Sequence, residues 1–369
     1  MTRLFATGYR LLPMASTQVA LVDPAVDPST DPPTLDEPSL AVASAGLPWH
    51  RTRVQGRVAT YARVGEGLPA VLLHGWGLGH RPYRAAIERL VELGCEVWAP
   101  ALPGFGGTAG VPASEAGIDA YADWVADFLD EVGVDEPVLL LGHSFGGGVS
   151  IATAHRHPDK VRALVLVNSI GGATWRAATD GGVDQLLVDR PWWDWSLHFP
   201  RDLLPVQQGR RVLPVVLREA VPNLLRNPAA MFRAGELART ADLTAELEEL
   251  KRRKLPVMAV WGARDGVVPR ASFEALCRAV GTEGEVVDGT HSWLLADPAA
   301  FGEVMTNAVE VARLARAAST TPLGTEEGSM APTPIERLKA RWRRARAKGP
   351  ARRATRRFRR GEPVRSVQP

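Results

Sequence analysis

A serine set between two glycines is the strongest indication of chemistry in this chain. The segment Gly142-His143-Ser144-Phe145-Gly146 follows an apolar run and precedes small residues that are compatible with a helix. A G-x-S-x-G pattern in this context is typical of a serine on a tight strand-to-helix turn, with its hydroxyl exposed. The turn is strained, so positions 142 and 146 require small residues. The pattern predicts that Ser144 is a nucleophile.

A serine hydroxyl becomes a good nucleophile when a base accepts its proton. His291, in the segment D-G-T-H-S-W, follows a predicted strand and is the best candidate for that base. Its loop lies at the carboxyl edge of the predicted sheet, where catalytic groups of open α/β sheets gather. Asp265 follows the preceding predicted strand and is expected to orient the histidine. The chain order Ser144, Asp265, His291 is the one expected for this kind of turn.

Other residues compete for these roles. Asp288 and Asp297 lie closer to His291 in the sequence. Asp288 is expected in or just after a strand, and Asp297 fits a helix N-cap. Asn168 follows an earlier strand at an alternative acid position, but it is not a carboxylate. His143 adjoins the nucleophile, and the tight turn is expected to point its side chain elsewhere.

A developing oxyanion needs two preorganised hydrogen-bond donors. The backbone N–H of Phe145, at the start of the predicted helix, supplies one. The segment His74-Gly75-Trp76-Gly77 follows an apolar strand, and the N–H of Trp76 is expected to supply the other. His74 is then expected to shape the loop by hydrogen bonding within the turn.

Alternating apolar and amphipathic segments predict the elements that position these residues. A hairpin is expected around Gln55-Gly56, and apolar strands recur before each glycine-rich turn. This rhythm favours an α/β fold, a mostly parallel central sheet with helices on both faces. The predicted helices fall within residues 80–93, 116–132, 145–157, 243–254, 270–280 and 297–317.

Composition changes along the chain predict its domains. A Pro- and Asp-rich arm is expected to be disordered over residues 1–48, followed by the α/β domain over 49–317. The strand–helix rhythm breaks over 171–253, where several short amphipathic helices are expected as a cap. A linker over 318–333 leads to a basic tail over 334–369, which begins with a short amphipathic helix.

These segments together resemble the α/β-hydrolase fold family over roughly residues 50–315. The family places a variable helical cap after its sixth strand, and the 171–253 segment matches that placement. The resemblance is to the single-domain, cofactor-free branch that includes esterases, lactonases, carbon–carbon bond hydrolases and non-haem haloperoxidases. Relatives with an aspartate nucleophile are excluded because position 144 is serine. The motifs that carry the resemblance are HGWG (74–77), LPGFGGT (102–108), GHSFGG (142–147), GARDGVVP (262–269) and GTHSW (289–293).

The resemblance implies hydrolysis of a carboxylic ester, lactone or related carbonyl compound through an acyl-enzyme. No metal or organic cofactor is expected, since the chain has neither a phosphate-binding glycine loop nor His and Cys at metal-ligand spacing. A carbon–carbon bond hydrolase, an acyltransferase and a non-catalytic binding module stay open as alternatives. The side chains of Trp76, Phe145, Trp192 and Trp195 are predicted to contact the substrate.

The net charge of +3 conceals an asymmetry. Residues 336–369 hold 14 Lys and Arg against 2 Asp and Glu, a net of +12, which leaves −9 for the rest of the chain. The tail is predicted to make a weak contact with an anionic membrane surface or nucleic acid. A solvated extension is the alternative. The sequence does not predict an oligomeric state.

The compartment is predicted from the chain's start and from its cysteines. Cys95 and Cys277 lack metal-ligand spacing and are expected to be reduced thiols. The N-terminal segment does not resemble a secretory signal, because charged residues and proline interrupt its apolar run. We therefore expect a cytoplasmic protein.

Overall fold

The computed structural model describes residues 47–115, 117–175, 185–190 and 206–320. The chain divides into two compact units, Met1–Ser44 and Ala45–Pro369, and every described residue belongs to the second. Nearly all of the predicted arm and linker, and the whole predicted basic tail, lie outside the described residues.

A single eight-stranded sheet forms the centre of the second unit, in the order β1-β2-β4-β3-β5-β6-β9-β10. β2 pairs antiparallel with both β1 and β4, and all other neighbours run parallel. Every residue of the central strands β3 and β5 is buried, as expected where helices cover both faces of a parallel sheet. The strands are β1 (Trp49–Val54), β2 (Arg57–Val64), β3 (Leu68–Leu73), β4 (Cys95–Pro100), β5 (Val138–His143), β6 (Val161–Val167), β9 (Val257–Gly262) and β10 (Glu285–Val287).

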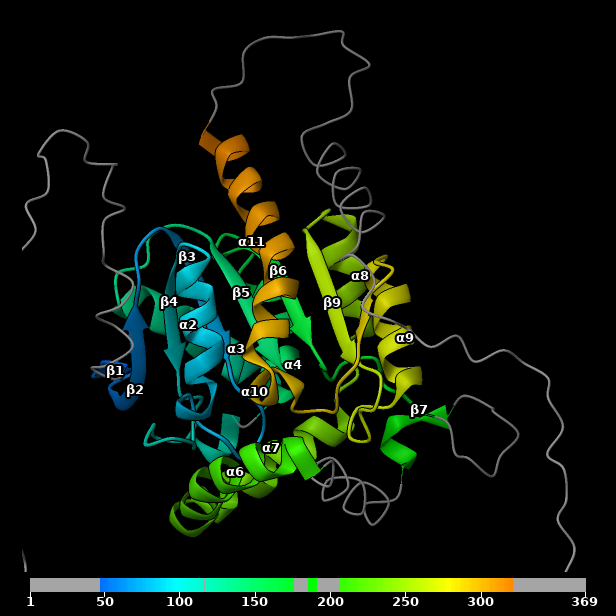
Figure 1. Cartoon of the computed structure of the whole chain (residues 1–369). Coiled ribbons are helices and arrows are strands. Elements are labelled where there is room, and N and C mark those ends of the chain that lie inside the picture. The colour runs from blue at the N-terminus through cyan, green and yellow to red at the C-terminus, as the bar shows by residue number, and fades with distance from the viewer. Residues whose placement is uncertain (1–46, 116, 176–184, 191–205, 321–369) are drawn as a thin grey trace, which may run out of the picture. The chain divides into compact units, whose positions relative to one another are not determined.

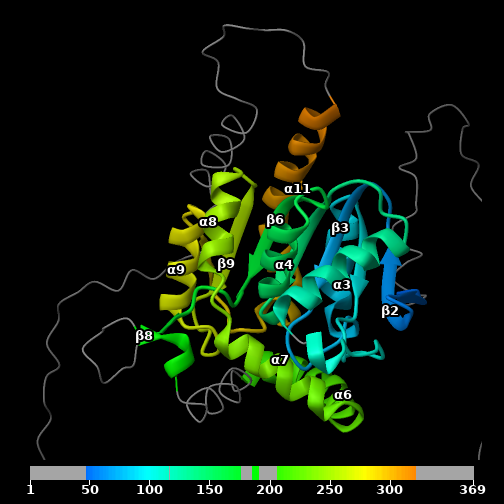
Figure 2. The same ribbon diagram turned by 180° about the vertical axis from the view of Figure 1, so that it is seen from behind.

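Helices cover both faces of the sheet, so the predicted fold class is confirmed (Figures 1 and 2). One face carries α2 (Arg84–Glu92), α10 (Trp293–Ala296) and α11 (Pro298–Thr320). The other carries α3 (Ile118–Glu131), α4 (Phe145–Arg156) and α8 (Thr244–Arg252). Helix α9 (Arg270–Val280) packs beside α8 and β9. Short 3₁₀ turns at Arg81–Tyr83 (η1) and Ala113–Glu115 (η2) precede α2 and α3.

The predicted hairpin is present at the antiparallel edge of the sheet. Trp49 pairs with Ala62, and the register runs to Val54 opposite Arg57. Gln55 and Gly56 form the turn with φ of 50° and 73°. Two successive residues with positive φ give the turn type that matches the twist of a two-residue hairpin.

The chain between β6 and β9, which we call the insertion, holds the largest departures from the predicted elements. It contains a small sheet of β7 (Thr174–Trp175) and β8 (Gln185–Leu186), the turn η3 (Leu187–Asp189), and the helices α6 (Val206–Arg226) and α7 (Pro228–Thr240). α6 and α7 lie across one end of the main sheet (Figure 1). Helix α8 packs against α4 and α9, so this last part of the predicted cap belongs to a helical layer of the sheet.

The prediction of short helices in the insertion is wrong for α6, which has 21 residues and continues through Pro214 and Pro222. A proline leaves the carbonyl four residues earlier without its helical partner. Pro214 is exposed and Pro222 is half-buried, so both prolines lie on the surface side of the helix. A surface helix tolerates such positions as a bend.

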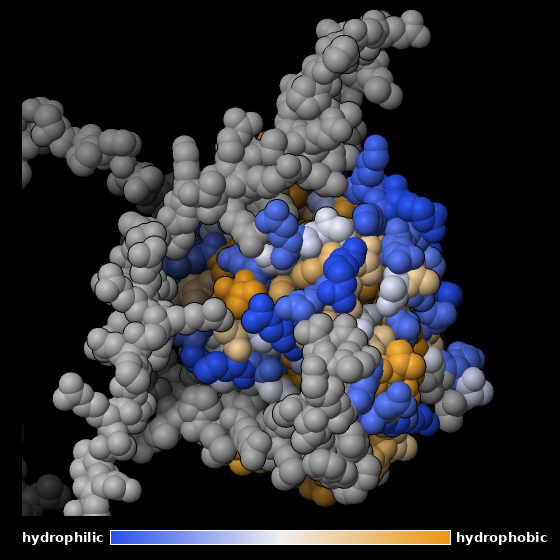
Figure 3. Space-filling model, turned by 90° about the vertical axis from the view of Figure 1, so that its right-hand side faces the viewer, coloured by the Kyte–Doolittle hydropathy of each residue, from blue (hydrophilic) through white to orange (hydrophobic). Residues whose placement is uncertain are grey.

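The surface of the α8 and α9 side is mostly hydrophilic, with smaller apolar areas between the charged side chains (Figure 3). Leu247 of α8 and Leu276 of α9 point inward and are almost fully buried. In the part of the chain that the structure describes, no helix is long and apolar enough to cross a lipid bilayer.

Candidate active site

Ser144 lies on the turn between β5 and α4, at the carboxyl end of the central strand. Its backbone has φ of 54° and ψ of −116°, a conformation that non-glycine residues rarely adopt and that costs energy. The Ser144 N–H donates to the carbonyl of Val167 on β6 at 3.0 Å, which holds the turn against the neighbouring strand. The side chain is thereby fixed at the sheet edge, just before a helix N-terminus.

The two glycines of the turn are required by close packing. A Cβ on Gly142 would lie 2.3 Å from the carbonyl oxygen of Gly146, and a Cβ on Gly146 would lie 2.5 Å from that of His74. Both distances are far shorter than a carbon–oxygen contact allows. The prediction that positions 142 and 146 must be small is confirmed.

The structure brings Ser144, His291 and Asp265 together from three separate loops. The His291 Nε2 lies 2.9 Å from the Ser144 Oγ, and the His291 Nδ1 lies 2.9 Å from the Asp265 Oδ2. All three side chains are buried. A carboxylate accepts, so Nδ1 carries the proton and Nε2 is left to accept from the serine hydroxyl.

The carboxylate of Asp265 is held by its own loop. Its Oδ1 accepts hydrogen bonds from the N–H groups of Val267 at 2.8 Å and Val268 at 2.9 Å. The competing carboxylates lie elsewhere. Asp288 is 82% exposed and pairs with Arg264, while Asp297 accepts from the N–H of Ala300 as the N-cap of α11.

Asn168 takes part in the site, although its sequence position suggested only a missing carboxylate. Its amide donates to the Oδ2 of Asp265, and its Oδ1 accepts from the Nε1 of Trp293 at 2.8 Å. Asp265 therefore accepts four hydrogen bonds, counting the one from His291. The sequence did contain a signal for this role: Asn168 is a polar residue directly after an apolar strand, and that strand lies beside the one that carries Asp265.

A second buried network, which sequence reasoning missed, connects three loops of the site. The N–H of Gly75 donates to the Tyr83 hydroxyl at 2.9 Å, and this hydroxyl lies 2.6 Å from the His143 Nδ1. The His143 Nε2 lies 3.0 Å from the backbone oxygen of His291. A carbonyl can only accept, so Nε2 carries the proton and Nδ1 accepts from Tyr83.

Burial keeps His143 and His74 neutral. Desolvation, reinforced by the nearby His291, lowers the pKa of His143 to about 3. Desolvation lowers the pKa of His74 to about 4. His74 shapes its loop as predicted: its Nε2 accepts from the N–H of Leu102 at 2.8 Å, and its Nδ1 donates to the carbonyl of Gly75 at 2.8 Å.

The two N–H groups predicted as oxyanion donors lie on loops that meet at Ser144. Phe145 is the first residue of α4, where helical N–H groups have no partner within the helix. Trp76 follows Gly75, and a Cβ on Gly75 would lie 3.3 Å from the Cβ of Ser144. Both segments therefore border the serine.

Comparisons with known proteins identify the family to which this fold belongs. A family model described as alpha/beta hydrolase fold matches residues 69–298, which is more than half of the chain. The chain belongs to the α/β-hydrolase fold family. The match extends from β3 to the start of α11, and so includes Ser144, Asp265 and His291.

Within this family, one relative is a pimeloyl-[acyl-carrier protein] methyl ester esterase from Aromatoleum aromaticum. It is 32% identical over 56% of this chain and 83% of its own length. Among solved structures, a thermophilic esterase from Thermogutta terrifontis has a TM-score of 0.57 at 22% identity, covering 71% of this chain and 99% of its own. A bromoperoxidase from Bacillus anthracis has a TM-score of 0.57 at 18% identity, covering 71% and 100%.

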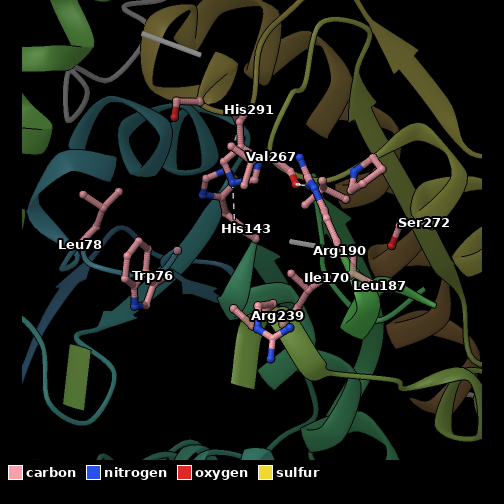
Figure 4. Close-up of a pocket in the computed structure, with 16 residues that line it drawn as sticks. Trp76, Leu78, His143, Ile170, Leu187, Arg190, Arg239, Val267, Ser272 and His291 are labelled. Atoms are coloured by element: carbon pink, nitrogen blue, oxygen red, sulfur yellow. Dashed lines mark hydrogen bonds between the residues drawn. The ribbon is translucent and has the colours of Figure 1, made fainter. Parts of the chain in front are cut away.

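Ser144 lines an open cavity of this α/β-hydrolase, and Figure 4 shows the cavity with labelled lining residues that include His291 and Trp76. Its volume is about 880 Å³, including its opening to solvent. Ser144 and His291 border it from the sheet edge, and the insertion adds Leu187, Arg190 and Arg239. The apolar side chains around it are Trp76, Leu78, Ile170, Leu187, Val267 and Val268.

The predicted substrate-contacting side chains divide into three cases. Trp76 lines the cavity, and its Nε1 donates to the carbonyl of Met231 on α7 at 2.7 Å. The prediction for the side chain of Phe145 is not supported: this ring is fully buried in the core, edge-on to Tyr121, and is not among the cavity's lining residues. The ring of Phe145 therefore packs in the core, although the residue directly follows Ser144. Trp192 and Trp195 lie outside the described residues.

Trp293, which follows His291 by two residues, is buried and contacts Phe301. Cys95 and Cys277 are buried free thiols. Across the described segments, no group of three or more His, Cys, Asp or Glu residues is arranged to hold a metal ion.

Proposed function

We propose that this protein is a serine hydrolase that cleaves a carboxylic ester, a lactone or a related carbonyl compound through an acyl-enzyme. The observation that carries the proposal is the buried chain of two 2.9 Å contacts from Ser144 through His291 to Asp265. Such a chain gives a serine hydroxyl a base that is itself oriented by a carboxylate. The family and the esterases among the relatives support the same chemistry.

In the first step, the Oγ of Ser144 attacks the substrate carbonyl as His291 Nε2 takes the hydroxyl proton. The carbonyl oxygen becomes an anion that accepts from the N–H groups of Phe145 and Trp76. The bond to the leaving group then breaks, and His291 returns the proton to the departing oxygen. The acyl group stays on Ser144.

In the second step, water replaces the leaving group. His291 accepts a proton from that water, the water oxygen attacks the acyl carbon, and the bond to the Oγ of Ser144 breaks as the proton returns to it. Asp265 stabilises the imidazolium that forms in both steps. The bonds from Val267, Val268 and Asn168 fix this carboxylate in place throughout.

Labelling with a fluorophosphonate probe tests the activated serine. We expect wild-type protein to be labelled and Ser144→Ala to remain unlabelled. Ser272→Ala is a matched control, because Ser272 lines the same cavity, and its buried Oγ has no hydrogen-bond partner among the described residues. Labelling of Ser144→Ala at the wild-type level, or no labelling of folded wild type, would contradict the proposal.

A substrate panel tests the reaction class. We expect turnover of p-nitrophenyl esters that increases with the apolar character of the acyl chain, because the cavity around the serine is largely apolar. Turnover of vinylogous diketones in place of esters would indicate a carbon–carbon bond hydrolase. A rate that rises with added alcohol acceptors would indicate an acyltransferase.

A further inference from the structure

The outward face of α6 is apolar, which is unusual for a surface helix. Val221 is 46% exposed, Leu217 is 51% exposed and Leu225 is 77% exposed. On α7, which packs against α6, Phe232 is 72% exposed. Surface helices normally turn such residues toward the core and charged residues toward water. A contiguous apolar surface on a soluble domain marks an interaction site.

The orientation of α6 is fixed by a buried polar residue. Asn223 is 4% exposed; its Nδ2 donates to the carbonyl of Gly77, and its Oδ1 accepts from the N–H of Gly106, both at 3.0 Å. Successive residues of a helix are rotated by about 100°. Val221 and Leu225, two positions to either side, therefore face almost directly away from Asn223. The two hydrogen bonds of Asn223 therefore keep Val221 and Leu225 on the outward side of α6.

The charge of α6 is positive. Its sequence contains four arginines and a single acidic residue, Glu219. Glu219 is half-buried against the body beside Arg81, with 3.9 Å between their charged atoms. Arg218 is exposed, and no hydrogen bond or ion pair is recorded for it among the described residues, whereas Arg226 interacts with Glu219. Arg218 thus lies beside the outward apolar residues on the helix surface.

We propose that the outward face of α6, formed by Leu213, Leu217, Val221, Leu224 and Leu225 with Arg218, binds the surface of an anionic lipid bilayer. An interfacial helix of this kind buries aliphatic side chains in the headgroup region while arginines contact anionic lipids. The face is a convex helix surface. A bilayer accommodates such a surface, whereas a protein partner must supply a complementary pocket.

A second copy of the chain fits less well. In a twofold interface the same positively charged patch lies on both sides. Like charges brought together in an interface oppose association. Anionic lipid neutralises them instead.

The position of α6 gives the binding a consequence for the site. α6 packs against α7, and α7 contributes Ala238 and Arg239 to the cavity wall. A bilayer bound at α6 therefore lies on the same side of the molecule as the insertion that borders the cavity (Figure 1). Binding at this face does not depend on the proposed hydrolysis.

Flotation of full-length protein with vesicles tests the proposal. The probes are vesicles of phosphatidylcholine alone and of phosphatidylcholine with phosphatidylglycerol, at low and at raised salt. We expect wild type to float with the anionic vesicles. For the variant Leu217→Asp/Leu225→Asp, we expect the affinity for the anionic vesicles to fall by at least about tenfold. The reason is that two partly exposed leucines no longer enter the headgroup layer. The basic tail is present in every protein, and raised salt suppresses its purely electrostatic contribution.

Val286→Asp/Leu186→Asp is the matched control, because it makes the same change at exposed apolar residues on β10 and β8. We expect this control to float like wild type, and all variants to keep the far-UV circular dichroism of wild type. Equal flotation of wild type and Leu217→Asp/Leu225→Asp would overturn the proposal. Absence of wild-type flotation would also overturn it. This holds both if the protein remains monomeric and if it forms a concentration-dependent dimer that the double variant abolishes.

Discussion

The two walls of the cavity are built differently. The wall formed by the sheet edge holds Ser144, His291 and Asp265 in a continuous buried network, with four hydrogen bonds to one carboxylate. In its described part, the wall formed by the insertion is attached by the packing of Met231, Ala234 and Ala238 into the core and by hydrogen bonds that do not form one network. Among them, Arg190 donates to the carbonyls of Val267 and Gly266, and Trp76 donates to Met231.

This difference separates the groups proposed to carry out the reaction from the groups that contact the substrate. A rigid, fully bonded wall suits groups whose positions must be kept within a fraction of an ångström for proton transfer. A wall held by apolar packing and by separate hydrogen bonds can vary in sequence without disturbing that chemistry. We therefore expect substitutions in the sheet-edge wall to lower kcat, and substitutions in the insertion to change KM or surface binding.

The largest effect is expected from Asp265→Asn. The amide cannot stabilise the imidazolium of His291, and its NH₂ group can face the ring nitrogen that ought to donate. We expect kcat for a p-nitrophenyl ester to fall by about 10³- to 10⁴-fold with little change in KM. Steady-state kinetics measure this.

The matched control for Asp265→Asn is Asp288→Asn. Asp288 is nearer to His291 in sequence, but its side chain is exposed beside Arg264. We expect kcat within about twofold of wild type, as for a surface substitution. Equal losses in the two variants would show that the acid of the site has been misidentified.

Tyr83→Phe is expected to have the next largest effect. It removes the hydroxyl that accepts from Gly75 and donates to His143, leaving two buried polar groups without a partner. At about 1–3 kcal/mol for each such group, the free energy of unfolding should fall by about 2–6 kcal/mol. Chemical denaturation measures this loss.

The same substitution tests whether the network positions the base. Tyr83 reaches the His291 backbone through His143, so its loss should also lower kcat, by about tenfold, and shift the pH profile of kcat/KM. Tyr61→Phe is the control, because the ring of Tyr61 packs against Phe128 and its hydroxyl has no recorded partner in the described structure. A stability loss with unchanged kcat and pH profile would make Tyr83 a purely structural residue.

The sheet-edge wall is also the part that the sequence predicts best. Gly142, Ser144 and Gly146 satisfy a backbone requirement that few other residues meet, so a local pattern identifies the turn. Asp265 and His291 could be predicted because parallel strands bring their carboxyl ends to one edge, whatever the distance along the chain. Asn168 and Tyr83 carry no such local pattern. Their roles depend on which loops lie side by side in three dimensions.

The insertion resisted prediction for a physical reason. Its prolines at 214 and 222 normally end helices, yet α6 continues through both. Its apolar residues face water at Val221 and Leu225, so the usual rule that apolar positions mark the buried face fails. The polar Asn223 faces inward instead and makes the contacts to the body. A pattern based on burial cannot predict a helix whose outward face is apolar.

The smallest effect is expected from Asn223→Ala. This substitution tests whether the insertion wall affects KM without affecting kcat. The substitution removes both hydrogen bonds from α6 to the body, at Gly77 and Gly106, and should lower the free energy of unfolding by about 1–2 kcal/mol. We expect KM for a p-nitrophenyl ester to rise by about threefold to tenfold while kcat stays within about twofold, because no group that reacts has been moved.

Leu224→Ala is the control for Asn223→Ala, since this neighbouring side chain is 41% exposed and makes no polar contact with the body. We expect its stability within about 0.5 kcal/mol of wild type, with unchanged kinetics toward soluble ester. Gly77 directly follows Trp76, whose N–H is a proposed oxyanion donor, so a fall in kcat for Asn223→Ala would have a specific meaning. The insertion would then hold an oxyanion donor in place, and the separation of chemistry from specificity would fail at that contact.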